Sequence, residues 1–249
     1  MELFAEFKFD ESADPFTDSE DPLQPPDHFE RDTDPAQLLR GQLASYVAAL
    51  SGSQFRVHGF TILICGKLAR LMHWDRNGAV VSRAFNYTKF NYLGLFLQHY
   101  DRVVDRRGHD PTVTIPSRST LRKVTKHDQK TLAEYNERHQ EFRVMLIPDP
   151  DDVSRESEFL ISYPPKYTRS PFGRATKPMA GYDLKQSRFV FVKDYWRPVG
   201  SDKEGDIGSH GYKSPAFCLF TFSPDSSSNR TRVLFCPFLQ SSSSNTHLP

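Results

Sequence analysis

Long apolar runs are missing from this chain of 249 residues, and no stretch approaches the ~20 consecutive apolar residues that span a bilayer. The first ten residues lack the basic and then apolar pattern of a secretory signal. Three cysteines, Cys65, Cys218 and Cys236, are too few and too widely spaced for a disulfide scaffold or a C-x-x-C site. We therefore expect an intracellular protein that is neither secreted nor inserted in a membrane.

A large excess of charge is also missing. The 32 basic and 31 acidic residues leave a net charge of +1, which argues against an extended nucleic-acid surface. The histidines at positions 58, 73, 99 and 109 lack partners at metal-ligand spacing, so structural roles are the simpler interpretation. Nucleic acid and membranes are therefore not the expected partners, and the partner that we expect is an unidentified protein.

The N-terminal region predicts disorder followed by a β-rich fold. Residues 1–35 are acidic and rich in proline and serine, a composition that buries too little apolar surface to offset the entropy of ordering. Residues 36–49 carry apolar residues at helical spacing. Residues 55–85 predict an antiparallel meander of three strands, 55–65, 68–74 and 79–85. Its second turn is expected at Asn77-Gly78, because this dipeptide tolerates the positive φ values of tight hairpins.

The rest of the chain predicts further helices and a second group of strands, so the expected fold class is α+β. Residues 91–104 return to helical spacing and close a β-rich region over 36–115. Residues 116–150 predict a charged helical insertion. Strands are expected at 158–163, 177–182 and 188–194, before an irregular, serine- and phenylalanine-rich tail over 208–249.

Lys193 is the first candidate for chemistry, because it ends an apolar strand in the run Phe189-Val-Phe-Val-Lys-Asp-Tyr-Trp-Arg. A strand-end lysine pairs with nucleotide phosphates when a glycine-containing loop lies one hairpin earlier. Gly173 is the candidate loop glycine, and Glu204 is the candidate carboxylate partner of Lys193. Spacing alone favours the other interpretation: a lysine stem that covers apolar surface, and an ordinary turn glycine.

Taken together, six segments resemble the fungal-type protein kinase family, over roughly residues 36–207. The two most specific are the run Arg70-Leu-x-x-Trp-Asp-Arg-x-Gly-Ala and the run Lys193-Asp-x-Trp-Arg. The segments are 54–58, 65–80, 108–112, 173–176, 189–197 and 204–207.

The resemblance implies a family-specific β-rich region followed by part of a kinase N-lobe over 157–207. Lys193 would match the lysine that contacts the ATP α- and β-phosphates, Glu204 its helix partner, and Gly173 the glycine-rich loop. ATP with Mg²⁺ would then be the cofactor. Phe191, on the same strand face as Lys193, replaces the usual small alanine and would crowd the adenine, which counts against ordinary ATP binding.

Residues needed for phosphoryl transfer are missing from these 249 residues. His-Arg-Asp, Asp-Phe-Gly and Ala-Pro-Glu do not occur, and after Ile207 the sequence Gly-Ser-His-Gly-Tyr-Lys-Ser-Pro is poor helix material. We therefore expect no catalytic or metal-binding residue here and no kinase activity. Three hypotheses remain: a truncated kinase-like fragment, a non-catalytic protein-binding module built on the β-rich region, and a nucleotide-binding pseudokinase.

Overall fold

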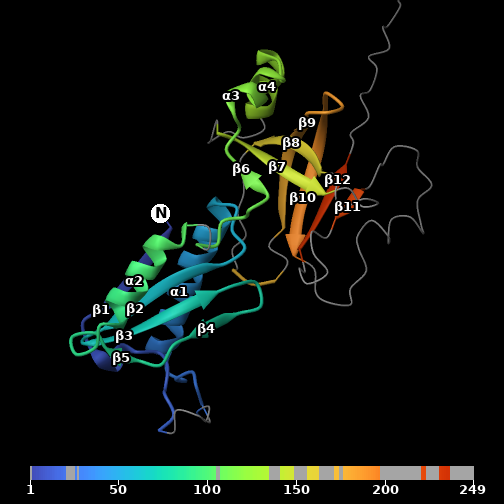
Figure 1. Cartoon of the computed structure of the whole chain (residues 1–249). Helices are drawn as coiled ribbons and strands as arrows, with labels where there is room; N and C mark the ends of the chain where they lie inside the picture. Colours follow the sequence, from blue (N-terminus) through green and yellow to red (C-terminus); the bar gives the residue numbers. More distant parts are fainter. Residues whose placement is uncertain are drawn as a thin grey trace, which may run out of the picture. The chain divides into compact units, whose positions relative to one another are not determined.

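The computed structural model shows an α+β chain that divides into two compact units (Figure 1). Unit 1 contains Met1–Val113 and Lys166–Thr176, and unit 2 contains Thr114–Pro165 and Lys177–Pro249. The structure describes residues 2–20, 26, 28–104, 107–134, 141–148, 156–162, 171–173, 176–196, 220–222 and 230–235.

Unit 1 is built on a mixed five-stranded sheet in the order β1-β2-β3-β4, with β5 also paired to β3. The β2–β3 and β3–β4 pairs are antiparallel, as predicted, but β1 pairs with β2 in parallel, from Leu3 opposite Phe60 to Lys8 opposite Cys65. The strands are β1 (Leu3–Lys8), β2 (Gly59–Cys65), β3 (Leu68–Trp74), β4 (Ala79–Val81) and β5 (Phe85–Asn86).

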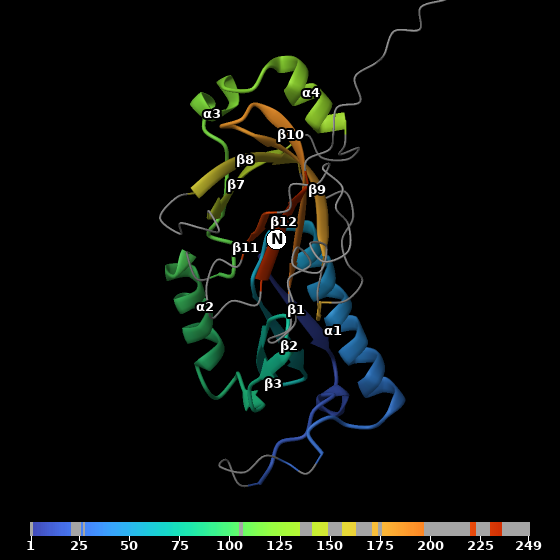
Figure 2. The same cartoon turned by 90° about the vertical axis from the view of Figure 1, so that its right-hand side faces the viewer.

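Two helices cover opposite faces of this sheet (Figures 1 and 2). The first, α1 (Asp34–Ser53), has Thr33 as its N-cap, Pro35 in its first turn and an apolar stripe at the predicted helical spacing. Leu39, Leu43 and Val47 of α1 pack with Leu63, Cys65, Met72 and Trp74 of the sheet. The second, α2 (Tyr92–Arg102), covers the other face through Leu93 and Phe96, which pack against Ile62, Ile64 and Ala69.

The prediction of disorder over residues 1–35 is wrong for the part of this segment that the structure describes. Besides β1, it contains a short 3₁₀ helix, η1 (Glu11–Ala13), which begins where the Asp10 side chain accepts a hydrogen bond from the Ser12 N–H. Asp14 and Phe16 are each only 5% exposed. Average composition concealed this order, because a few apolar side chains suffice where an existing sheet and helix supply the rest of the core.

The hairpin turns of unit 1 form where they were predicted, but the β3–β4 turn is stabilised by a side chain and not by residues with positive φ. The Asp75 carboxylate accepts hydrogen bonds from the N–H groups of Asn77 and Gly78, and neither of these two residues has positive φ. The left-handed residue belongs to the β2–β3 turn, at Gly66 with φ 55°. The predicted third strand is also divided, because β4 ends at Val81 and β5 begins at Phe85.

Within its described residues, unit 2 contains a seven-stranded sheet and two short helices, α3 (Arg118–Arg122) and α4 (Lys126–Glu134). Leu132 of α4 and Val124 pack on Val144, Leu160 and Tyr182 of the sheet. The strand order is β11-β12-β10-β9-β8-β7-β6. The strands are β6 (Val113–Thr114), β7 (Phe142–Pro148), β8 (Glu156–Ser162), β9 (Lys177–Asp183), β10 (Arg188–Trp196), β11 (Phe220–Phe222) and β12 (Arg230–Phe235).

Two predictions for unit 2 require correction. The insertion predicted to be helical over 116–150 contains α3 and α4 but also β7. Phe142, Val144 and Leu146 of β7 lie on the face of the sheet that packs with α4. The tail 208–249 is not wholly irregular, because β12 pairs with β10 and β11 pairs with β12. The three strands predicted at 158–163, 177–182 and 188–194 correspond to β8, β9 and β10. None of the helices that the structure describes has the length and apolar character to cross a membrane.

Cys65 is expected to be an unreactive thiol, because it is 2% exposed in the core beneath α1. Burial, reinforced by the nearby negative charge of Asp14, raises its pKa from 9.0 to about 11. At pH 8 the thiolate fraction is then about 100-fold lower than in the unfolded chain. Mass-spectrometric mapping of iodoacetamide labelling should show slow modification of Cys65 at pH 8, rapid modification in urea, and acceleration only as the pH rises toward 11. Equal rates in the native and unfolded protein would contradict the burial.

Candidate functional site

Strand β10 places Lys193 and Phe191 on one face of the unit 2 sheet, as the alternation of the sequence predicted. Phe191 is 41% exposed and Lys193 is partly exposed, whereas Val190 and Val192 on the opposite face are buried. The Lys193 Nζ atom lies 5.6 Å from the centroid of the Tyr195 ring, which also belongs to this face. In β9, Pro178 stands opposite Lys193 and Ala180 opposite Phe191. The Lys193 ammonium group therefore lies over an aromatic ring, and Phe191, two positions earlier on the same face, is a large apolar side chain that remains partly accessible.

Asp194, the next residue of the Lys-Asp-x-Trp-Arg run, has a different environment. It is 2% exposed and stands directly opposite Lys177, which is 3% exposed. Opposite charges at facing positions of an antiparallel pair favour one register over its neighbours. The acidic residue of the run thus has a buried position in which opposite charges favour the observed register of β10 against β9.

Gly173 lies in unit 1, on the segment 171–173, whereas Lys193 lies in unit 2. Its N–H donates to the carbonyl of Arg76 at 3.1 Å, and its φ of 78° is in the left-handed region that favours glycine. The Arg76 guanidinium, itself buried, donates to the Pro171 carbonyl at 2.8 Å. These bonds hold the segment against the β3–β4 turn. The third predicted residue, Glu204, lies outside the described residues.

A metal centre is not found within the part of the chain that the structure describes, where no three His, Cys, Asp or Glu side chains converge. The histidines have other contacts. His109 Nε2 lies 2.8 Å from Glu2 Oε1, and the rings of His58 and His73 are 5.0 Å apart beside Phe60. Burial, with a contribution from His58, lowers the pKa of His73, which favours its neutral form.

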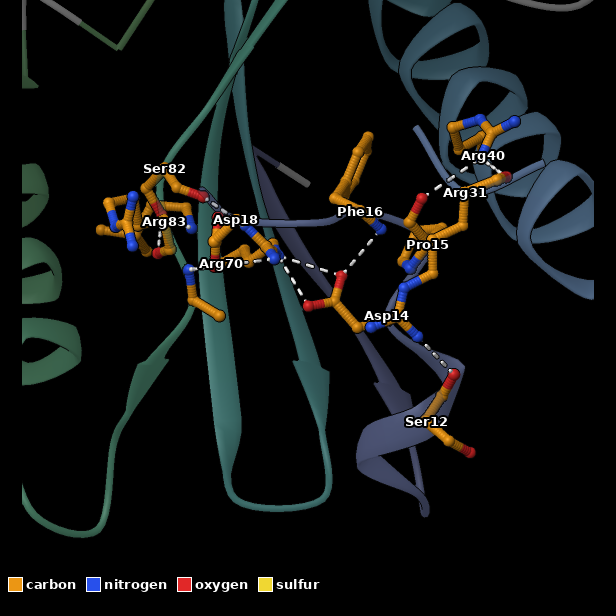
Figure 3. Close-up of polar contacts among 12 residues, drawn as sticks. Ser12, Asp14, Pro15, Phe16, Asp18, Arg31, Arg40, Arg70, Ser82 and Arg83 are labelled. Atoms are coloured by element: carbon orange, nitrogen blue, oxygen red, sulfur yellow. Dashed lines mark hydrogen bonds and ion pairs between the residues drawn. The ribbon is translucent and has the colours of Figure 1, made fainter. Parts of the chain in front are cut away.

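Arg70, the first residue of the other specific run, is the centre of a buried ionic network (Figure 3). It is 3% exposed, and its Nε donates to both Asp14 carboxylate oxygens at 2.8–2.9 Å. Its two terminal nitrogens pair with Asp18 at 2.8 and 3.0 Å, and one of them also donates to the Ser82 carbonyl. The guanidinium lies over the ring of Phe16. The Arg70 side chain therefore links the segment between β1 and α1, which we call the N-terminal segment, to β3.

Three further residues of this run, Trp74, Gly78 and Ala79, line a pocket. Trp74 is 5% exposed, donates its indole N–H to Thr61, and stacks with Phe172 at 6.0 Å between ring centroids. Gly78 and Ala79 follow in the turn and in β4. We call the adjoining cavity of about 480 Å³ the α1–β4 pocket. Its walls come from the N-terminal segment, α1, the β3–β4 hairpin and the segment 171–173; they are Phe16, Phe29, Glu30, Arg40, Gly41, Leu43, Ala44, Trp74, Gly78, Ala79, Val81 and Phe172.

Sequence reasoning missed this pocket because several of its walls come from the segment assigned to disorder. Phe16 and Phe29 stack at 4.9 Å, and the segment closes on itself through the bonds Thr17 N–H to Phe29 carbonyl and Arg31 N–H to Pro15 carbonyl. A useful indication was present, since disordered segments contain few aromatic residues and this one contains Phe16 and Phe29 within 14 positions. Comparison of the chain with protein-family models, curated proteins and solved structures gave no match.

Proposed function

We propose that the chain is related to fungal-type protein kinases and that unit 2 contributes its nucleotide-facing surface, with Lys193 as the phosphate contact. The observation that carries the proposal is the placement of Lys193 and Phe191 two positions apart on one face of β10, where Phe191 is 41% exposed and Lys193 is partly exposed. An ammonium group at this position, supported by the Tyr195 ring, is suited to pair with a phosphate oxygen.

Nucleotide binding and phosphoryl transfer are separate parts of this proposal. Transfer requires a residue that orients the nucleophile and ligands for Mg²⁺, and the motifs that supply them do not occur in residues 1–249. When bound, ATP with Mg²⁺ would supply the transferable phosphoryl group, and Lys193 would hold its phosphates. We accordingly propose that the chain by itself binds nucleotide weakly and transfers no phosphate.

Phe191 provides the test, because its ring stands beside Lys193 where a base would pack. We expect Phe191→Ala to bind Mg-ATP at least about tenfold more tightly than the wild-type chain, since truncation opens space over Ala180. In that background Lys193→Ala should weaken binding about 10- to 100-fold, the range expected for a charge-assisted hydrogen bond of ~1.5–3 kcal/mol. Isothermal titration calorimetry measures both effects.

Lys185→Ala in the same Phe191→Ala background is the matched control. Lys185 is an exposed lysine in the β9–β10 turn, so its removal changes the net charge equally without touching the β10 face. Binding should then remain within about twofold of the Phe191→Ala value, an energy difference near RT. If Lys185→Ala and Lys193→Ala weaken binding equally, the effect is general electrostatics and the assignment of Lys193 is wrong.

A further inference from the structure

We infer that unit 1 binds an extended peptide, which adds a strand to the outer edge of β4 and inserts a large apolar side chain into the α1–β4 pocket. This site lies on a different unit from Lys193 and does not depend on nucleotide binding. Three features support it: the size and lining of the pocket, the backbone groups of β4, and an exposed carboxylate at the pocket.

The pocket has room for a whole side chain. Its volume of about 480 Å³ is within the range of known binding cavities, roughly 300–1,000 Å³. Large rings form part of its walls, among them Phe172, which is 38% exposed. Gly41, Ala44 and Gly78 add walls with little or no side chain, and a Cβ placed on Gly41 or Gly78 would meet no atom within 4 Å. An aromatic or long aliphatic side chain fits this combination of open space and apolar lining.

The backbone of β4 offers hydrogen bonds beside the pocket. Asp75 N–H donates to the Gly78 carbonyl, and Ser82 N–H donates to the Leu71 carbonyl. Because hydrogen-bonding direction alternates along a strand, Ala79 and Val81 direct their N–H and C=O groups away from β3. Their side chains line the pocket. Strand β4 is the last in the sheet order, and among the described residues no strand pairs with its outer edge.

Charge at the pocket adds a preference to the predicted ligand. The Glu30 side chain is 62% exposed and pairs with the Arg40 Nε at 3.0 Å. Arg40 is also held by the carbonyls of Pro15 and Arg31, so it remains in place if Glu30 accepts a second cation. In an extended peptide, residues two positions apart share a face. We therefore expect a lysine or arginine two positions from the apolar anchor.

Selection of a random dodecapeptide phage library on the full chain tests the inference directly. We expect enrichment of sequences that carry an aromatic or long aliphatic residue with Lys or Arg two positions away. The enriched peptides should bind in fluorescence anisotropy, and Glu30→Gln should reduce the preference for the basic residue at least about threefold. Failure to enrich any common pattern would overturn the inference.

Gly41→Trp and Gly41→Ala form the matched pair for the pocket. The tryptophan would enter the open space and should weaken peptide binding at least about tenfold, whereas alanine leaves the pocket open and should not change it. Circular dichroism confirms that both variants are folded. Val80→Thr is a second control, because Val80 is 72% exposed and its side chain, opposite His73, does not line the pocket.

N-methylation of the peptide tests strand addition on the unmodified protein. A paired strand directs alternate N–H groups toward β4, so methyl groups at alternate positions should abolish binding in one register and be tolerated in the other. Peptides that tolerate methylation at every position, or that bind Gly41→Trp as tightly as wild type, occupy another surface and would overturn the inference.

Discussion

Replacing Arg70 with methionine is expected to destabilise unit 1 by about 3–5 kcal/mol, the cost typical of removing one partner from a buried ion pair. The guanidinium and Asp14 are 3% and 5% exposed, so water cannot substitute for the lost partner. The change also removes both bonds to Asp18 and the bond to the Ser82 carbonyl. The N-terminal segment would lose its attachment to β3.

The measurement must isolate unit 1, because a chain with two units need not unfold in one step. The two tryptophans allow this: Trp74 is buried in unit 1 and Trp196 belongs to unit 2. In a Trp196→Phe background, urea unfolding followed by tryptophan fluorescence reports on Trp74 alone. Arg83→Met is the matched control, since Arg83 is exposed and donates to the Ser19 carbonyl, whereas Arg70 is buried. It should cost less than about 1 kcal/mol.

Two further variants identify the source of the loss. Arg70→Lys keeps the charge but cannot present a planar fork to Asp14 and Asp18 together, so a smaller but clear loss is expected. Adding Asp14→Asn to Arg70→Met should recover part of the stability, because the amide removes the orphaned charge and its oxygen can still accept the Phe16 N–H. A double variant no more stable than Arg70→Met would show that buried charge is not the cause.

The difference between wild type and Arg70→Met should also shrink at acidic pH. Burial by itself would raise the pKa of Asp18, but hydrogen bonds from Arg70 and from the Ala84 N–H hold it below its ordinary value of 3.8. A carboxylate with a lowered pKa contributes stability above pH 3.8, and the contribution disappears as the pH falls through the lower folded value. The wild-type protein loses this contribution in acid, whereas Arg70→Met has already lost the part that Arg70 supplies.

The elements of the fold that sequence patterns predicted are those whose cause is local. Helix α1 follows from apolar spacing and its N-terminal proline, and β2 and β3 follow from two apolar runs joined at Gly66. The parallel pairing of β1 with β2 joins residues more than 50 positions apart, so no local pattern predicts it. Asp14 and Phe16 are ordered for the same reason, because Asp14 contacts Arg70 of β3 and Phe16 packs in the core between α1 and the sheet.

In the candidate sites too, local features were predicted from the sequence and features that depend on distant segments were not. The alternation of β10 placed Lys193 and Phe191 on one face correctly, since side-chain direction in a strand is a local property. The segment of Gly173 is instead held by Arg76, almost 100 positions earlier, and the α1–β4 pocket combines four separate segments. Individual residues of the Arg70–Ala79 run were recognised as specific, but their shared role around one network and one pocket depends on tertiary contacts.

Gly108→Ala is expected to be the most disruptive small substitution in unit 1. A Cβ at this position would overlap the His58 carbonyl oxygen and lie 2.8 Å from its carbon, and the φ of 90° is itself unfavourable for alanine. The obstructing atoms are backbone, so no side-chain rotation relieves the clash. The two segments would have to separate, breaking the bonds from Val57 N–H to Gly108 and from the fully buried Arg56 to Arg107. We expect a loss above about 3 kcal/mol.

Gly173→Ala is the control that distinguishes the cost of the steric clash at Gly108 from the cost of placing alanine at positive φ. Gly173 also has positive φ, 78°, and belongs to unit 1, but a Cβ there would meet no atom within 4 Å. It should therefore lose only the left-handed penalty of about 1–2 kcal/mol. The Trp74 fluorescence assay measures both variants under the same conditions. Equal losses would mean that backbone conformation alone makes glycine necessary at position 108. A larger loss for Gly108→Ala would explain why the Gly108-His-Asp-Pro-Thr segment begins with glycine: the chain after α2 passes too close to the His58 backbone for any side chain.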